Sequence, residues 1–190
     1  MTLCLYELAL LEIMLLLRGA AEVVTSPPSE TPISGEAMGR VKIYPNADVL
    51  IEDDKIVAVG SNLESDSAQV IDVTGKVILP GFVDPHTHLV WSGSREHELE
   101  WKLQGRSYQE ILADGGGILR TVKETRNSDE EELQQESLIR FKSAVKHGST
   151  TVEIKSGYGL EKETELKQLR VANWLGNLGL AETVTTFMGA

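Results

Sequence analysis

Two histidines lie two positions apart, shortly after an apolar segment. Residues 77–83 form that segment, interrupted only by Pro80-Gly81, and His86 and His88 follow it. Because side chains alternate along a strand, histidines at positions i and i+2 face the same side. Neutral imidazole is a ligand for zinc, iron, nickel and copper ions. The spacing therefore predicts that His86 and His88 share one metal ion, and the alternative is a pair of packed or solvated histidines.

A second candidate group is the guanidinium of Arg95, seven residues after His88. A planar guanidinium holds a carboxylate through two parallel hydrogen bonds, so Arg95 is suited to an acidic small molecule. The alternative is an exposed ion pair with Glu96 or Glu98, which contributes little to stability. From the residues alone, the ion pair is the favoured interpretation.

Tyr158 stands between Gly157 and Gly159, directly after a β-branched run. Glycines on both sides permit a tight turn and a close approach of the backbone to a ligand. A phenol can donate a hydrogen bond while its ring packs on a flat molecule. The alternative is a tyrosine that only closes a turn.

Other residues are weaker candidates. The triple glycine at residues 115–117 suits an anion-binding nest, although it lacks the ending of a P-loop and is equally typical of a mobile loop. Tyr108 lies in the same region and is a further, weaker candidate. His97 and His147 are interpreted as non-ligands, because His147 ends a predicted helix where a cation suits the helix dipole. We interpret Lys155 as structural.

The first 80 residues predict a small antiparallel β unit. A strand is expected around residues 15–25, followed by a loop-rich stretch over residues 26–46. Residues 47–60 predict a β-hairpin, because two apolar runs flank an acidic turn. Two more short strands are expected at residues 69–72 and 76–79.

The second half predicts alternating strands and helices. Helices are expected at residues 128–147 and 161–178, and strands near residues 78–83, 150–155 and 183–187. This alternation is typical of parallel βα units. A complete barrel of eight such units takes about 250 residues. The fold class is therefore α/β, an incomplete (β/α)8 TIM-type barrel over residues 79–190, after an N-terminal β segment over residues 1–78.

Composition excludes several classes of protein. The chain has 190 residues, 18 Lys and Arg against 29 Asp and Glu, and a net charge of −11, which argues against nucleic acid or an anionic membrane as partner. The single cysteine, Cys4, excludes an internal disulfide. The apolar run at residues 3–17 has no basic residue before it and is too short to span a bilayer. We expect a cytoplasmic protein.

Residues 77–88 resemble the first-strand signature of the amidohydrolase superfamily. Later blocks are similar to the imidazolonepropionase family within it, namely residues 93–98, 103–105, 115–118, 151–160, 163–167 and 169–171. Several blocks in the same order are far more specific than one motif. The resemblance extends from about residue 47 to the end of the chain, and the residues before Leu15 show none.

The resemblance implies a small β-sandwich, built from both chain ends, beside a distorted (β/α)8 barrel. It implies one zinc or iron ion, held by paired histidines, a later histidine and a late aspartate. His86 and His88 match the pair, and we expect the other two ligands to lie beyond Ala190. Arg95 and Tyr158 match substrate-binding positions. The implied substrate is the small molecule 4-imidazolone-5-propanoate, which is hydrolysed to N-formimino-L-glutamate in histidine degradation, and the implied assembly is a homodimer.

Two alternatives stay open. Another cyclic amidohydrolase or a deaminase would share His86 and His88 but should not need Arg95 and Tyr158. A degenerate, non-catalytic chain would fold without holding a metal ion. No residue is a persuasive general acid or base, so we expect no catalytic residue within the chain. Two ligands also fall short of the three usual in catalytic zinc sites, so the 190-residue chain alone is expected to show no turnover.

Overall fold

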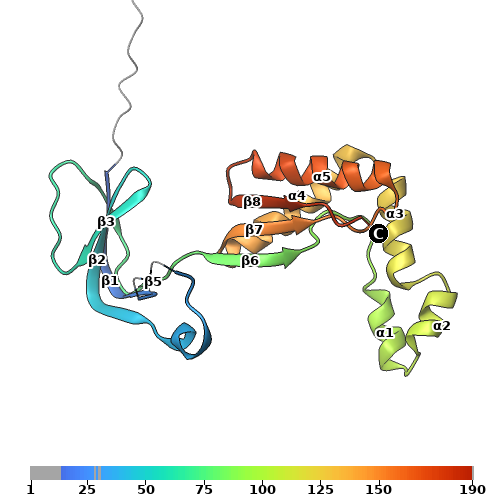
Figure 1. Ribbon diagram of the computed structural model, residues 1–190, viewed down its shortest axis with the longest axis horizontal. Helices are drawn as coiled ribbons and strands as arrows, with labels where there is room; N and C mark the ends of the chain where they lie inside the picture. Colours follow the sequence, from blue (N-terminus) through green and yellow to red (C-terminus); the bar gives the residue numbers. More distant parts are fainter. Residues whose placement is uncertain (1–13, 28, 30, 190) are drawn as a thin grey trace, which may run out of the picture. The chain divides into compact units, whose positions relative to one another are not determined.

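The computed structural model describes residues 14–27, 29 and 31–189. The chain divides into two compact units, one ending at Pro80 and the other beginning at Gly81. Each unit contains its own sheet, as Figure 1 shows. Cys4 and residues 3–13 of the N-terminal apolar run lie outside the described residues.

The first unit is a five-stranded mixed sheet. Its strands run in the order β3-β2-β1-β4, and β5 also pairs with β1. The strands are β1 (Met14–Thr25), β2 (Lys42–Glu52), β3 (Lys55–Gly60), β4 (Gln69–Asp72) and β5 (Val77–Ile78). β2 is antiparallel to β1 and β3, whereas β4 and β5 are parallel to β1. The prediction of an antiparallel unit is therefore wrong for β4 and β5, because the chain after β3 returns beside β1 in the same direction.

The predicted first strand and hairpin are confirmed. Asp53 forms the hairpin turn with a left-handed φ of 53°. The loop-rich stretch is shorter than predicted, because β2 already begins at Lys42 and a short 3-10 helix occupies Gly35–Gly39. Small and β-branched residues of β1 and β2 form the buried core of the unit, namely Ala20, Val23, Ala47 and Val49.

The second unit is an α/β layer structure with a parallel sheet in the order β6-β7-β8. The strands are β6 (Phe82–Thr87), β7 (Ser149–Lys155) and β8 (Glu182–Thr186). Helix α4 (Glu130–Lys146) precedes β7, and α5 (Lys162–Gly176) connects β7 to β8. Apolar residues from β7 and both helices pack into one core, including Phe141, Val152, Ile154, Val171 and Leu175. The predicted α/β alternation is confirmed.

Three further helices lie between β6 and α4. They are α1 (His97–Leu103), α2 (Tyr108–Ala113) and α3 (Gly117–Asn127), and none was predicted from the sequence. Figure 1 shows them beyond the carboxyl ends of the strands, where βα loops of this class carry binding residues. No helix in the described part of the chain is long and apolar enough to cross a membrane.

The first strand of the parallel sheet lies later than predicted. Val77–Ile78 forms β5 and pairs with β1, which confirms the strand predicted at residues 76–79 in the first unit. Ile78, which was also included in the strand predicted near residues 78–83, therefore does not belong to the parallel sheet. The strand β6 then starts at Phe82 and continues to Thr87. As a consequence His86 lies within the strand, and His88 directly follows it.

Candidate functional site

An irregularity in β6 sets the orientation of the two histidines. β6 pairs with β7 at Asp84 and again at Thr87, and the register shifts between these residues. The Thr87 hydroxyl donates a hydrogen bond to the carbonyl of Glu153 at 2.6 Å, which fixes the strand after the shift. The ring centroids of His86 and His88 lie 5.4 Å apart at an interplanar angle of 62°. The structure thus brings the two imidazoles together at the carboxyl end of β6.

The environment of His88 favours a neutral imidazole. His86 is exposed, whereas His88 is partly buried. Burial lowers the pKa of His88, and positive charge on His86 lowers it further. Neutral imidazole is the form that binds metal ions. The Nδ1 atom of His88 is buried and has no hydrogen-bond partner in the described part of the chain, an arrangement that calls for a ligand or another partner.

The two imidazoles fit a zinc or iron ion as part of a ligand set, because both metals accept histidine nitrogen. Among residues 14–27, 29 and 31–189, no group of three or more His, Cys, Asp or Glu side chains could hold a metal ion. Catalytic zinc sites usually have three protein ligands. The described residues therefore supply two candidate ligands rather than a complete set.

Tyr158 lies beside His88, just after β7. The two ring centroids are 5.3 Å apart. This approach depends on Gly157, whose φ is 127° and where an added Cβ would lie 3.3 Å from Cε1 of His88. A cavity of about 320 Å³ is lined by His88, Ile118, Gly157, Tyr158, Leu160, Met188 and Gly189. Its volume is in the range of small-molecule pockets, so Tyr158 and His88 face a space that a small ring compound can occupy.

Arg95 faces a second cavity, of about 240 Å³, together with Trp91, Thr121 and Tyr158. Tyr158 lines both cavities and therefore links the imidazole pair to the guanidinium. The Arg95 side chain is about one-third exposed, at 32%. Arg95 is thus accessible to a ligand, and its charge favours an anionic group.

A buried carboxylate orients Arg95. The guanidinium Nε and Nη2 atoms of Arg95 donate to Glu98 at 3.0 to 3.1 Å. Glu98 is only 2% exposed and also accepts a hydrogen bond from the Gly117 amide at 2.7 Å. The hydrogen bond with Arg95 lowers the pKa of Glu98 and raises that of Arg95. The ion pair with Glu98 is therefore present but partly buried. Residues 115–117 do not form the predicted anion-binding nest, because only the Gly117 amide binds Glu98, while the amides of Gly115 and Gly116 donate to the carbonyls of Leu112 and Ile111 at the end of α2.

Two histidines interpreted as non-ligands make local contacts. His147 follows α4, and its Nδ1 lies 2.7 Å from the carbonyl oxygen of Ser143. The ring of His97 packs edge-on against Trp101, with centroids 4.9 Å apart. Both residues thus have neighbours within their own helices.

Lys155 and Tyr108 also have defined surroundings. Lys155 donates to the Glu153 carboxylate at 2.6 Å, in agreement with a structural role. Tyr108 is half-exposed, and its hydroxyl would lie 3.3 Å from a Cβ added at Gly117. Tyr108 therefore lies beside the segment that binds Glu98, near Arg95.

Comparison with known proteins identifies relatives of the chain. A sequence profile of the amidohydrolase family matches residues 69–126. The chain is 45% identical over 186 residues to an imidazolonepropionase of Shouchella clausii, a match that covers 93% of the chain and 42% of the relative. It is 48% identical over 181 residues to an imidazolonepropionase of Alkaliphilus metalliredigens, covering 92% of the chain and 43% of the relative. The chain is a relative of the imidazolonepropionases. It spans less than half the length of these curated relatives.

Solved structures support the same fold. Atrazine chlorohydrolase TrzN from Arthrobacter aurescens TC1, solved in complex with zinc, matches the chain with a TM-score of 0.54 and 21% identity. This match covers 91% of the chain and 35% of that structure. At this identity the likeness concerns the fold alone, which is part of an amidohydrolase α/β domain.

Three buried polar residues near this site were missed from the sequence. Glu98 was considered only as an exposed partner of Arg95. Glu165 was part of the similar segment 163–167 but was given no role, and Gln168, which lies between that segment and residues 169–171, was not singled out. A signal was available, since Glu165 and Gln168 lie at the spacing of the buried stripe of α5 that continues with Ala172 and Leu175. A carboxylate and an amide within an apolar stripe indicate polar groups with a specific partner.

Proposed function

We propose that the chain is part of a metal-dependent hydrolase that opens the cyclic amide of 4-imidazolone-5-propanoate to give N-formimino-L-glutamate in histidine degradation. The observation that carries this proposal is the position of Tyr158, whose ring contacts His88 and lines the cavity of Arg95. A flat ring that bears a carboxylate chain suits an aromatic ring beside a guanidinium. The identity of 45% to 48% with imidazolonepropionases supports the same substrate.

The proposed roles follow from the contacts. Glu98 binds Nε and Nη2 of Arg95, and we assign Nη1 to the propanoate carboxylate. Tyr158 packs against the ring of the substrate. His86 and His88 hold one zinc or iron ion, which when bound supplies an activated water and polarises the ring carbonyl. The general acid and base are not assigned to this chain.

The likeness to imidazolonepropionases also supports the larger architecture proposed for the protein. Residues 79–190 then form the first units of a (β/α)8 barrel, and residues 1–78 form one part of a composite β-sandwich. A cytoplasmic location and a homodimer belong to the same proposal. Size-exclusion chromatography with light scattering of the 190-residue chain tests the dimer, and a monomer at all concentrations would contradict it.

Metal titration tests the histidine pair. We expect the chain to bind one Zn²⁺ by isothermal titration calorimetry, and His86→Ala or His88→Ala to weaken binding by at least about tenfold, since each removes a ligand. His147→Ala is the matched control, because that histidine lies at the end of α4, away from the pair. Equal binding in all variants would contradict the site, and a folded chain that binds no Zn²⁺ would favour the non-catalytic alternative.

Ligand titration tests Arg95 against the alternative of a deaminase. Imidazole-4-propanoate keeps the ring and the carboxylate chain, whereas 4-ethylimidazole lacks the carboxylate. We expect Arg95→Ala to weaken the first ligand by about tenfold to a hundredfold, the range of a charge-assisted hydrogen bond, and to leave the second unchanged. Arg170→Ala, which removes a guanidinium paired with Glu130 on an exposed surface, is the control. Equal affinity for both ligands in the wild type would contradict recognition of the carboxylate.

A further inference from the structure

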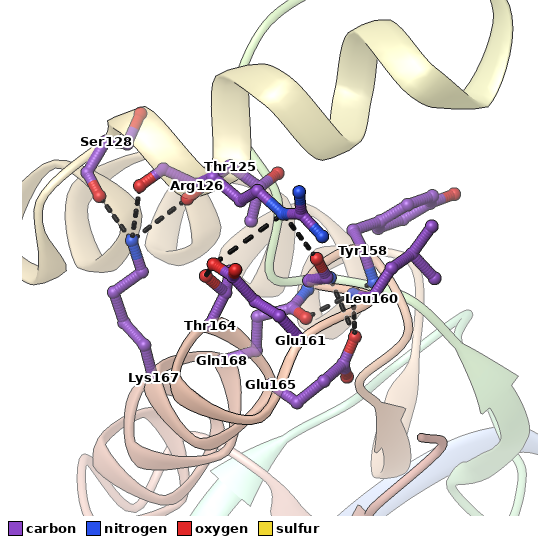
Figure 2. Close-up of polar contacts among 11 residues, drawn as sticks. Thr125, Arg126, Ser128, Tyr158, Leu160, Glu161, Thr164, Glu165, Lys167 and Gln168 are labelled. Carbon is purple, nitrogen blue, oxygen red and sulfur yellow. Dashed lines mark hydrogen bonds and ion pairs between the residues drawn. The ribbon is translucent and has the colours of Figure 1, made fainter. Parts of the chain in front are cut away.

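Three consecutive backbone amides after β7 are bound by two side chains of α5. Gln168 Oε1 accepts from the Tyr158 amide at 3.2 Å. Glu165 Oε1 accepts from the amides of Gly159 and Leu160 at 2.7 and 2.8 Å. Figure 2 shows these contacts, with the Tyr158 ring directed away from the two side chains. The backbone of this loop is thus held while the phenol ring is left available.

The loop adopts a conformation that needs such support. Leu160 has a left-handed φ of 52°, which is unfavourable for a branched side chain. At Gly159 an added Cβ would lie 2.7 Å from the backbone nitrogen of Glu165 and 2.9 Å from its Oε1. Backbone in sparsely populated regions persists only where its surroundings fix it. The contacts with Glu165 therefore hold the segment that follows Tyr158.

Gln168 connects this loop to the one that follows His88. Its Nε2 donates to the carbonyl of Val90 at 2.6 Å, while its Oε1 accepts from the Tyr158 amide. Val90 lies two residues after His88 in the sequence. One side chain, only 1% exposed, thus joins the backbone beside a candidate metal ligand to the backbone of a candidate substrate contact.

Stability alone does not account for this choice of residues. Glu165 is 1% exposed, and its Oε2 has no hydrogen-bond partner in the described part of the chain. A buried carboxylate with one unsatisfied oxygen is unfavourable, and a neutral glutamine would supply the same acceptor to the Gly159 and Leu160 amides without burying a charge. The polar pair is explained if the loop must keep one geometry.

We infer that Glu165 and Gln168 are positioning residues that fix the Tyr158 ring against His88 and beside Arg95. The inference rests on the proposed function, because it assigns Tyr158 to the substrate. Glu165 acts through the amides of Gly159 and Leu160, and Gln168 acts through the Tyr158 amide and the Val90 carbonyl.

Amide hydrogen exchange, measured by NMR on the 190-residue chain, tests without any ligand whether Glu165 and Gln168 hold the Tyr158 loop. Glu165→Ala should speed exchange of the Gly159 and Leu160 amides by about tenfold or more, because their acceptor is lost. Glu165→Gln, which retains an acceptor oxygen, should restore the slow rates. If Glu165→Ala does not fold, Gln168→Glu tests the positioning role instead. This variant keeps the acceptor for the Tyr158 amide and loses the donor to the Val90 carbonyl. Contacts between the rings of His88 and Tyr158, observed as nuclear Overhauser effects, should then weaken.

Lys167→Ala is the matched control. Lys167 is also on α5 and donates to the backbone carbonyls of Thr125, Arg126 and Ser128, so its loss removes hydrogen bonds but none of those that Glu165 and Gln168 make to the Tyr158 loop (Figure 2). The Arg126 side chain, which donates from Nε to the Gly159 carbonyl at 2.7 Å, stays in place in this variant. We expect it to lower stability but to leave exchange at residues 158–160 and the ring contacts unchanged. If the control and Glu165→Ala change these signals equally, the positioning role is wrong.

Binding of imidazole-4-propanoate then separates the positioning role of Glu165 and Gln168 from the proposal that Tyr158 contacts the substrate. We expect Glu165→Ala and Gln168→Glu to weaken binding at least about fivefold, and Lys167→Ala and Glu165→Gln to weaken it less than about twofold, as a positioning effect distinct from stability requires. Unchanged affinity in a variant whose loop has loosened would overturn the positioning role. If the wild type does not bind this ligand at all, the assignment of Tyr158 to the substrate fails, while the exchange rates and ring contacts still decide whether α5 positions its ring.

Discussion

Arg95 and Tyr158, the two proposed substrate contacts, are each held by a buried carboxylate, but in different ways. Glu98 binds the guanidinium of Arg95, the group proposed to meet the substrate. Glu165 instead accepts hydrogen bonds from the backbone amides that follow Tyr158, and not from its phenol hydroxyl. The orientation of Arg95 therefore depends on a pair of opposite charges, whereas that of Tyr158 depends on an acceptor for neutral donors.

Because of this difference, we expect Glu98 to need both its negative charge and its acceptor oxygen, whereas Glu165 needs only its acceptor oxygen. Hydrogen bonds between ionised groups are about twice as strong as those between neutral groups. The first unit, which does not contain these candidate site residues, offers a reference case, because Asp48 is buried and accepts from the amides of Gly19 and Leu63 at 2.8 and 3.0 Å. Binding of backbone amides by a buried carboxylate thus recurs in this chain as a structural device, and Glu98 adds an ion pair to it.

The largest effect is expected from Glu98→Ala. This substitution leaves the Gly117 amide without its acceptor and removes the partner of the Arg95 guanidinium. We expect a loss of about 2–3 kcal/mol in the free energy of unfolding, measured by urea denaturation, because a buried donor and a partly buried charge lose their partner. Glu96→Ala, at the exposed neighbouring carboxylate, should change stability by less than about 0.5 kcal/mol. Similar losses in the two variants would show that the Glu98 contacts contribute nothing specific.

Replacing each carboxylate by its amide sharpens the comparison. Glu98→Gln retains an acceptor for Gly117 but loses the charge that faces Arg95, so we expect a loss of about 1–2 kcal/mol in the free energy of unfolding. Glu165→Gln retains the acceptor that Gly159 and Leu160 need, and should stay within about 0.5 kcal/mol of the wild type. Equal effects in urea denaturation would mean that charge is irrelevant at Glu98, or required at Glu165, and the distinction would be lost.

Much of the fold was predictable because its signals are local. The hairpin around Asp53 and the helices α4 and α5 follow from alternating or helical apolar patterns in neighbouring residues. The direction of β4 and β5 was not predictable, because it depends on which edge of β1 the chain reaches after β3. Helices α1 and α2 were missed because they have only 7 and 6 residues and each buries a single residue, Glu98 and Ile111, so no apolar period appears. A local signal for α2 was nevertheless present, since Ser107 and Glu110 form a capping box.

In the candidate site, too, the features with local sequence signals were predictable and those that depend on distant contacts were not. The types and spacing of His86 and His88 follow directly from the sequence, and the structure places the rings close together. The partner of Arg95 was left open between Glu96 and Glu98, because both are near in sequence and only the turn into α1 decides which carboxylate is buried. The contacts of Gln168 with Val90 and Tyr158 span 78 and 10 residues, so no local pattern shows them.

The smallest predicted effect concerns pH and again separates the two carboxylates. The hydrogen bond with Arg95, the Gly117 amide and the nearby His97 lower the pKa of Glu98, against the opposing effect of burial. A carboxyl group whose pKa is lower in the folded state stabilises the fold above its unfolded pKa, and this contribution is lost as the pH falls toward the folded value. The difference in unfolding free energy between the wild type and Glu98→Gln should therefore be constant near pH 6 to 7 and shrink below about pH 4.3, the ordinary pKa of glutamate. Urea denaturation at a series of pH values measures it, with Glu96→Gln as the control for loss of one exposed acidic group. A difference that grows as the pH falls has the opposite sign and would show that Arg95 does not hold Glu98 in its ionised form.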